Sequence, residues 1–251
     1  MKKAKWLRNK VLNMAVKAGA GHIAPSFSCA DILISLYYGG GIKVDPDKPK
    51  WPNRDRFVLS KGQAAVALYA VLADKGFFPV KELDRFTQPG SSLGGHTEDN
   101  IIGVEAFTGS LGHGLPISCG LALGAKIDKK RYKVITLLGD GECHEGSVWE
   151  AAMFAAHHRL DNLLVIVDNN GLSATDHLSQ YLEVESLEEK WRAFGWKTTI
   201  VDGHSFDELI REIQRFRQGR SARPFVIIAK TVKGKGVSFM ENRPIWHYRI
   251  P

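Results

Sequence analysis

Hydrophobic and polar residues follow two alternating patterns along this chain, one typical of buried strands and one typical of amphipathic helices. Short apolar runs predict buried strands at Phe57–Leu59, Val134–Leu138, Leu163–Val167, Lys197–Val201 and Pro224–Ala229. Helical spacing predicts helices at Ala4–Lys17, Leu83–Gln88, Leu115–Lys126, Ser186–Phe194 and Phe206–Phe216, one opened by Ser28 and one ending at Leu72. Ser205 is expected to cap the helix that begins at Phe206. Strands that alternate with helices favour a doubly wound α/β fold, with a mostly parallel sheet and helices on both faces.

The most informative stretch runs from Val134 to Leu172, where each of two predicted strands ends in polar residues. The first strand leads into Gly139-Asp140-Gly141, and the second ends on Asp168-Asn169-Asn170. In an open parallel sheet, ligands bind beyond the carboxyl ends of the strands. Asp140 and Asn170 should therefore lie side by side if the two strands are neighbours. A carboxylate, an amide oxygen and a backbone carbonyl suit Mg²⁺ with an anionic ligand, and the glycines permit close approach of that ligand. The alternative is structural, because Gly-Asp-Gly and paired asparagines are also common turn formers.

Composition and charge exclude some classes of protein. The 251 residues carry a formal net charge of +7, but the basic residues are scattered and form no nucleic-acid-binding module. An anionic cofactor or an acidic partner chain explains the excess charge equally well. No apolar stretch is long enough to span a bilayer, and the N-terminus has the pattern of an amphipathic helix, not of a signal peptide. Three cysteines without metal-ligand spacing favour a reducing, cytoplasmic compartment.

Several separated motifs resemble the transketolase family. The segment GDGECHEGSVWEAA followed by NN resembles its thiamine diphosphate motif. The other matching segments, in their usual order, are GHIAPSFS, RDRFVLSKG, GGHTE, TGSLGHG and KTVKGKGVSFMENRPIWH. The resemblance covers nearly the whole chain and implies the thiamine-diphosphate-binding fold, in its diphosphate-binding form. It implies the N-terminal subunit of a split transketolase, a single domain over residues 1–251, with the pyrimidine-binding and C-terminal domains on a separate chain.

The resemblance also implies roles for individual residues. Asp140, Asn170 and the backbone carbonyl of Leu172 would bind Mg²⁺. Thiamine diphosphate would contact residues of several loops, namely Gln63, Gly109, Ser110, Leu111, Gly139, Asp140, Gly141, Glu142, Asn170 and His247. Three histidines, His22, His96 and His247, would hydrogen-bond sugar hydroxyls and transfer protons. Glu145 would belong to a proton relay that links two cofactors across a dimer interface.

The implied activity is the transfer of a two-carbon ketol unit from a ketose or ketose phosphate to an aldose. The glutamate that activates the cofactor lies on the pyrimidine-binding domain in this family, so activity is expected only with a partner subunit. Two copies of each chain would then form a heterotetramer in the cytoplasm, with sugars or sugar phosphates as substrates and neither nucleic acid nor membrane as a partner.

Two departures from the family pattern keep other functions open. The family motif SKGH reads Ser60-Lys61-Gly62-Gln63 here, so an amide that cannot exchange protons replaces an imidazole. Tyr248 follows His247, where split subunits usually have glycine. These changes favour a specialised sugar, or alternatively a 2-keto acid that is decarboxylated before acyl transfer. A non-catalytic binding module is a further alternative, but it predicts the loss of metal ligands, and Asp140 and Asn170 are both present.

Overall fold

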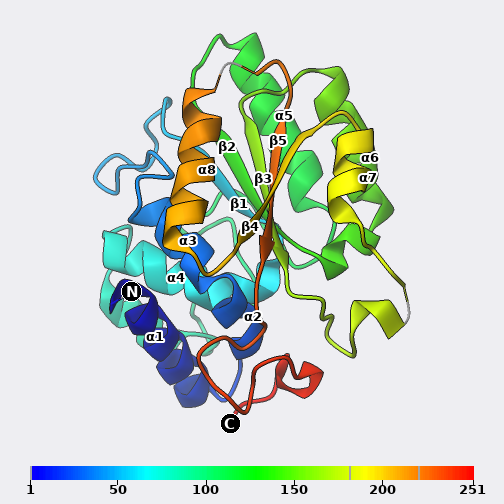
Figure 1. The fold of residues 1–251 in the computed structure, drawn as a ribbon. Helices are drawn as coiled ribbons and strands as arrows, with labels where there is room; N and C mark the ends of the chain where they lie inside the picture. Colours follow the sequence, from blue (N-terminus) through cyan, green and yellow to red (C-terminus); the bar gives the residue numbers. More distant parts are fainter. Residues whose placement is uncertain (1, 181, 220) are drawn as a thin grey trace.

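A five-stranded parallel sheet runs through the centre of the protein (Figure 1). The computed structural model describes residues 2–180, 182–219 and 221–251. Within them the strands lie in the order β1-β2-β3-β5-β4, and each neighbouring pair is parallel. Their bounds are β1 Arg56–Leu59, β2 Val134–Gly139, β3 Leu163–Asn169, β4 Lys197–Asp202 and β5 Phe225–Lys230. The predicted α/β fold with a parallel sheet is confirmed.

Helices cover both faces of this sheet, as the sequence predicts (Figure 1). One face carries α1 Lys2–Ala18, α2 Ile23–Ser28, α3 Ala30–Tyr37, α4 Ala65–Lys75 and α8 Phe206–Gln218. The other face carries α5 Gly114–Ile127, α6 Gly146–His157 and α7 Leu187–Ala193. Short 3-10 helices join these elements, namely η1 Gly62–Ala64, η2 Val80–Arg85, η3 Gly141–His144, η4 Leu178–Gln180 and η5 Pro244–Trp246.

Alternation along the central strands divides the core into two layers. In β2, Ile135 and Leu137 pack with the first group of helices, whereas Val134 and Leu138 pack with the second. Successive side chains of a strand point to opposite faces, and a strand covered on both faces needs apolar residues at every position. This requirement explains why the central strands appear in the sequence as continuous apolar runs.

Two of the expected helices differ from the structure. The helix expected to open at Ser28 begins at Ala30, and a separate helix, α2, occupies Ile23–Ser28. All six residues of α2 are buried, so no face of this helix is exposed, and the segment shows no amphipathic pattern of apolar and polar positions. The short helix expected at Leu83–Gln88 is a 3-10 helix at Val80–Arg85, which is stabilised by i→i+3 bonds and not by a longer amphipathic face. The predicted cap is confirmed, because the Ser205 hydroxyl accepts from the backbone N–H of Glu208.

Two further sequence predictions are the lack of a membrane-spanning segment and a reducing environment for the cysteines. Among residues 2–180, 182–219 and 221–251, no helix combines the length and apolar character needed to cross a bilayer. Cys29, Cys119 and Cys143 are free thiols and all three are buried.

A buried carboxylate, Asp31, joins α1 and α3 to the turn after β4. Arg8 donates to both of its oxygens, at 3.1 and 2.6 Å, and His204 Nδ1 lies 2.7 Å from Oδ2. The N–H of Val232 donates to His204 Nε2 at 2.9 Å, so the imidazole proton is on Nδ1 and is donated to Asp31. Burial alone would raise the pKa of Asp31, but the hydrogen bonds from His204 and Arg8 and the Arg8 charge lower it below 3.8.

Replacing Asp31 by asparagine is expected to weaken the fold by about 1.5–3 kcal/mol near neutral pH, the usual contribution of hydrogen bonds to a charged group. Because the folded-state pKa is depressed, this contribution is complete above the unfolded pKa and is lost as the pH falls through the folded pKa. Asp31→Asn should therefore also flatten the acid side of the stability profile, measured by urea unfolding at a series of pH values. Asp84→Asn, which breaks an exposed pair with Lys17, is the control and should change little. An unchanged acid limb in Asp31→Asn would contradict this assignment.

Candidate functional site

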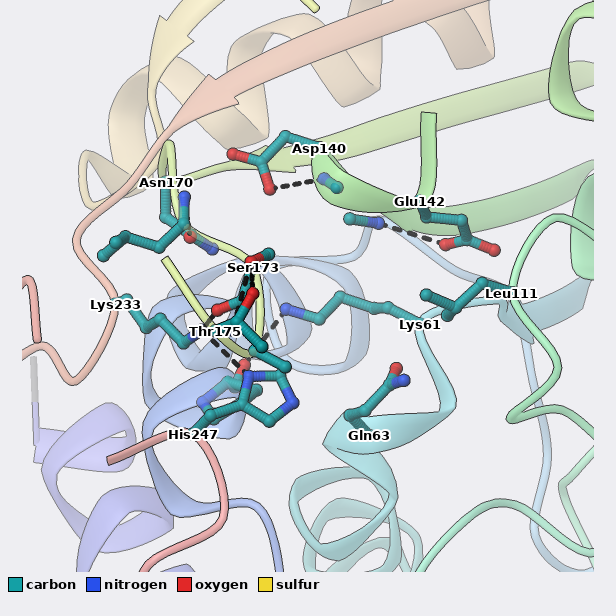
Figure 2. Close-up of a pocket in the computed structure, with 15 residues that line it drawn as sticks. Lys61, Gln63, Leu111, Asp140, Glu142, Asn170, Ser173, Thr175, Lys233 and His247 are labelled. Atoms are coloured by element: carbon teal, nitrogen blue, oxygen red, sulfur yellow. Dashed lines mark hydrogen bonds between the residues drawn. The ribbon is translucent and has the colours of Figure 1, made fainter. Parts of the chain in front are cut away.

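A cavity of about 330 Å³ opens at the carboxyl ends of β2 and β3 (Figure 2). Gly139 of β2 pairs with Asp168 of β3, so the polar residues that follow the two strands are brought together. Nine of the residues proposed for cofactor, metal or substrate line this cavity, namely Gln63, Leu111, Gly139, Asp140, Gly141, Glu142, Asn170, Leu172 and His247. The side-by-side placement expected for Asp140 and Asn170 follows directly from the parallel pairing of their strands.

Asp140 is a buried carboxylate without a cationic side chain bound to it among the described residues. Its side chain accepts from the backbone N–H groups of Gly141, at 2.8 Å, and Gly171. The residue is 2% exposed, and burial, followed by the nearby Asp168 charge, raises its pKa to about 6. A carboxylate that is desolvated in this way gains from a bound cation, because opposite charge restores the stability of the ionised form.

The oxygen donors around Asp140 fit a magnesium ion that is shared with an anionic ligand. Asn170 lines the cavity, and its Oδ1 accepts from the N–H of Leu172 at 3.1 Å, which leaves a second lone pair for a cation. Over the described part of the chain, no three His, Cys, Asp or Glu side chains form a metal site on their own. A cation here would therefore take one carboxylate, an amide, a backbone carbonyl and ligand oxygens, a combination that Mg²⁺ accepts.

Glu142 is a buried carboxylate that accepts hydrogen bonds from three segments around the cavity. Its Oε1 accepts from the Ser60 hydroxyl and from Gly112 N at 2.9 Å, and its Oε2 accepts from Gly139 N at 3.2 Å. Burial raises the pKa of Glu142, and these three donors oppose that rise. Glu142 thus joins the ends of β1 and β2 to the loop before α5, a positioning role in addition to its place in the cavity wall.

Two buried lysines supply positive charge at the cavity (Figure 2). Lys61 forms an ion pair with Asp168, which raises its pKa although burial alone would lower it. Lys233 is 1% exposed, and burial, with the charge of Lys61, lowers its pKa to about 8. It donates to the carbonyl of Ser173 and to His247 Nδ1. Neither lysine was assigned a role from the sequence, although both follow strands at the carboxyl edge, a position that could have indicated one.

The three proposed substrate-facing histidines form one cluster. The ring of His22 lies 5.3 Å from that of His96 and 5.2 Å from that of His247. Burial is the main cause that lowers the pKa of His22 to about 4 and of His247 to about 3, and burial also lowers that of His96. All three are therefore neutral near neutral pH and can donate and accept hydrogen bonds. His247 lines the cavity, whereas His22 and His96 lie beside it.

Other proposed site residues lie outside this cavity. Gly109 has a φ of +141°, and a Cβ there would come within 3.0 Å of the His96 ring, so glycine allows the ring to pack against the backbone. Ser110 is exposed and does not line the cavity. Glu145 is exposed at the start of α6, where it packs against Gly112. Glu145 thus lies beside the cavity and not within it.

The fold and the cavity define an α/β domain with its candidate site beyond the ends of parallel strands, and comparison with known proteins specifies the family. Residues 1–247 match the family described as transketolase, thiamine diphosphate binding domain. The chain is 40% identical to the 6-deoxy-6-sulfo-D-fructose transketolase subunit of Clostridium sp. and 41% identical to an apulose-4-phosphate transketolase subunit of Phocaeicola vulgatus. It covers 88% and 86% of these relatives, in each case with 97% of its own length.

The solved structures agree with this assignment. Transketolase from Campylobacter jejuni superposes on 99% of this chain with a TM-score of 0.92 and 32% sequence identity. The matched region is 40% of that transketolase chain, so the similarity is to one part of a larger enzyme. This protein belongs to the transketolase family, and residues 1–247 form its thiamine diphosphate-binding domain.

Proposed function

We propose that this protein is the diphosphate-binding subunit of a transketolase that transfers a two-carbon ketol unit from a ketose to an aldose. The observation that carries the proposal is that a cation and diphosphate site and a substrate-binding cluster lie next to each other in one chain of this family. The Asp140–Asn170 pair suits a cation and a diphosphate, and a cluster of neutral histidines suits a polyhydroxylated substrate beside them. The relatives are named as transketolase subunits for a sulfo-sugar and a sugar phosphate, which supports a sugar donor over a 2-keto acid.

Mg²⁺ would be held by the Asp140 carboxylate, the Asn170 amide oxygen and the Leu172 carbonyl. Bound thiamine diphosphate supplies the carbanion chemistry of the reaction. The chain itself contributes the buried charges of Lys61 and Lys233, which favour an anionic group in the cavity, and Glu142, which fixes the loops around it. Low dielectric in such a site makes these charges more effective than they would be in water.

The histidines would bind and orient the sugar. His22, His96 and His247 are neutral, so each ring presents one N–H donor and one acceptor nitrogen to hydroxyl groups. In His247 the Lys233 ammonium donates to Nδ1, so the proton of that ring is on Nε2. This N–H would donate to a substrate oxygen at which negative charge develops.

A second chain would complete the active site. The named relatives are close to this chain in length, and they support a pyrimidine-binding partner encoded separately. Two copies of each chain would form a heterotetramer in which Glu145 contributes to a proton relay between cofactors. Free, buried thiols at Cys29, Cys119 and Cys143 support a reducing, cytoplasmic compartment.

The decisive experiment is co-purification of the partner followed by an assay of ketol transfer with Mg²⁺ and thiamine diphosphate. We expect transfer from ketoses, including a 6-deoxy-6-sulfo-ketose and a ketose phosphate, only when both chains are present. The chain alone and the partner alone are the controls. Robust transfer by this chain alone, or turnover of pyruvate in place of all ketoses by the complex, would refute the proposal.

A further inference from the structure

The last segment of the chain returns to the histidine cluster and places an aromatic ring there. After β5, Gly234 N donates to the carbonyl of Ala24 at 3.1 Å, and the fully buried Met240 packs into the core. The short helix η5 follows, and then His247 and Tyr248. Figure 1 shows this segment, in red, next to α2 at the carboxyl edge of the sheet. The backbone contacts of the residues before Tyr248 therefore fix the position of this residue.

Tyr248 covers the central member of the cluster. Its ring centroid lies 4.6 Å from that of His22, with an angle of 62° between the planes, so the contact is edge-to-face. His22 is 9% exposed, and its Nδ1 is buried without a hydrogen-bond partner among the residues that the structure describes. An unpaired buried nitrogen is costly unless a ligand satisfies it. An unsatisfied nitrogen in a ring that contacts Tyr248 indicates a place where a substrate group contacts both residues.

The rest of the Tyr248 ring is available to a ligand. The residue is 54% exposed although one edge of its ring packs on His22. A sugar chain has hydroxyl groups that suit imidazoles, and it has C–H groups that suit an aromatic face. An aromatic side chain offers this apolar surface with few rotatable bonds, so little entropy is lost on contact. The ring lies beside His22 and does not line the cavity, so a substrate must extend out of the cavity to reach it.

We propose that Tyr248 is a specificity-determining residue, whose ring packs against the carbon chain of the sugar and favours long substrates over short ones. This inference rests on the proposed ketol transfer and deepens it, since it names the part of the substrate that the chain selects. Contact with a part of the substrate remote from the reacting carbons is a source of binding energy that truncated substrates lose.

The test compares three variants of the complete two-chain enzyme on a two-carbon hydroxyaldehyde and on a five-carbon aldose as acceptors. Tyr248→Gly removes the ring, Tyr248→Phe keeps it, and Ile245→Ala is the matched control at an exposed apolar side chain of the same segment. In Tyr248→Gly we expect kcat/KM for the five-carbon aldose to fall about tenfold relative to the two-carbon aldehyde, a difference of about 1.4 kcal/mol. Tyr248→Phe and Ile245→Ala should keep the wild-type ratio.

A second readout needs neither cofactor nor turnover. In the full chain alone, NMR titration of the His22 ring should give a low pKa, about 4, because the ring is buried. Removing the cover in Tyr248→Gly should raise this pKa toward 6.5, while Tyr248→Phe should leave it low. His96, Lys233 and Lys61 are the charged groups that lower the pKa of His22, His247 is a ring neighbour of it, and all four are retained in these variants.

The outcomes separate this inference from the proposed function. Transfer by the wild-type complex with an unchanged acceptor ratio in Tyr248→Gly overturns the specificity role, and so does an unchanged His22 titration. A wild-type complex that transfers no ketol unit to either acceptor contradicts the proposed function instead. A lowered ratio in Tyr248→Phe as well as in Tyr248→Gly would assign the effect to the hydroxyl group and also overturn the role of the ring.

Discussion

Asp140→Asn is expected to weaken cofactor binding strongly and yet leave the cofactor-free fold at least as stable as before. The substitution removes the only carboxylate proposed to bind Mg²⁺, and we expect the affinity of the two-chain complex for thiamine diphosphate in the presence of Mg²⁺ to fall about 100-fold, or about 2.7 kcal/mol. Without cofactor, the same substitution is expected to leave the free energy of unfolding unchanged or to raise it. Because burial raises the pKa of Asp140 to about 6, its charge weakens the empty fold, and asparagine removes that charge.

Two measurements check this prediction. Calorimetric titration of the complex gives the loss of affinity, and thermal unfolding of the chain without cofactor gives its stability, which should be unchanged or higher. Asp176→Asn is the control, since Asp176 is an exposed carboxylate in the loop that also carries Leu172 and Ser173. A variant that unfolds at lower temperature and loses binding in proportion would show that Asp140 is needed for folding and not for the cation.

Asp168→Asn is expected to cost about 3–5 kcal/mol of folding free energy, the usual effect of removing one partner from a buried ion pair. Asp168 is fully buried and accepts from Lys61, Ser28 and Thr231. Its replacement leaves the Lys61 ammonium buried without a counter-charge. Urea unfolding measures the loss, and Asp161→Asn, which breaks the exposed pair with Lys126, should cost about 0–1 kcal/mol.

The double variant Lys61→Met with Asp168→Asn sharpens this test. Removing both charges should recover part of the stability, because the unpaired charge causes most of the loss. If Lys61→Met lowers the stability of the Asp168→Asn variant as much as it lowers that of the wild type, the two residues act independently. The loss of the ion pair would then not be the cause of the lower stability of Asp168→Asn.

The sequence predicted those parts of the fold and site that depend on local pattern. The strands β2 and β3 are continuous apolar runs, and their polar ends could be placed together because parallel strands end on the same edge. The sequence could therefore predict that Asp140 and Asn170 lie at one edge, and both line the same cavity. The helix α2 was missed because every one of its residues is buried, so no amphipathic period exists to detect.

Other parts of the site depend on distant contacts that no local pattern encodes. Lys233 follows β5 in an irregular segment, and its hydrogen bonds reach the carbonyl of Ser173 and the ring of His247, which lie elsewhere in the sequence. The contact of Tyr248 with His22 joins segments that lie far apart in the sequence. The polar side chains of such segments have no periodicity, so their partners become known only from the three-dimensional structure.

The bond between Gly234 N and Ala24 O also has a consequence for the order of folding. It joins residues 210 positions apart, since 234 − 24 = 210, and it fixes the segment that carries Lys233 and His247. Closing so long a loop has an entropic cost, and contacts of high sequence separation form slowly. During synthesis, α2 leaves the ribosome long before its partner segment exists. β4 pairs only with β5 among the described strands, so both the far side of the sheet and the active edge are completed by the last residues of the chain to be added.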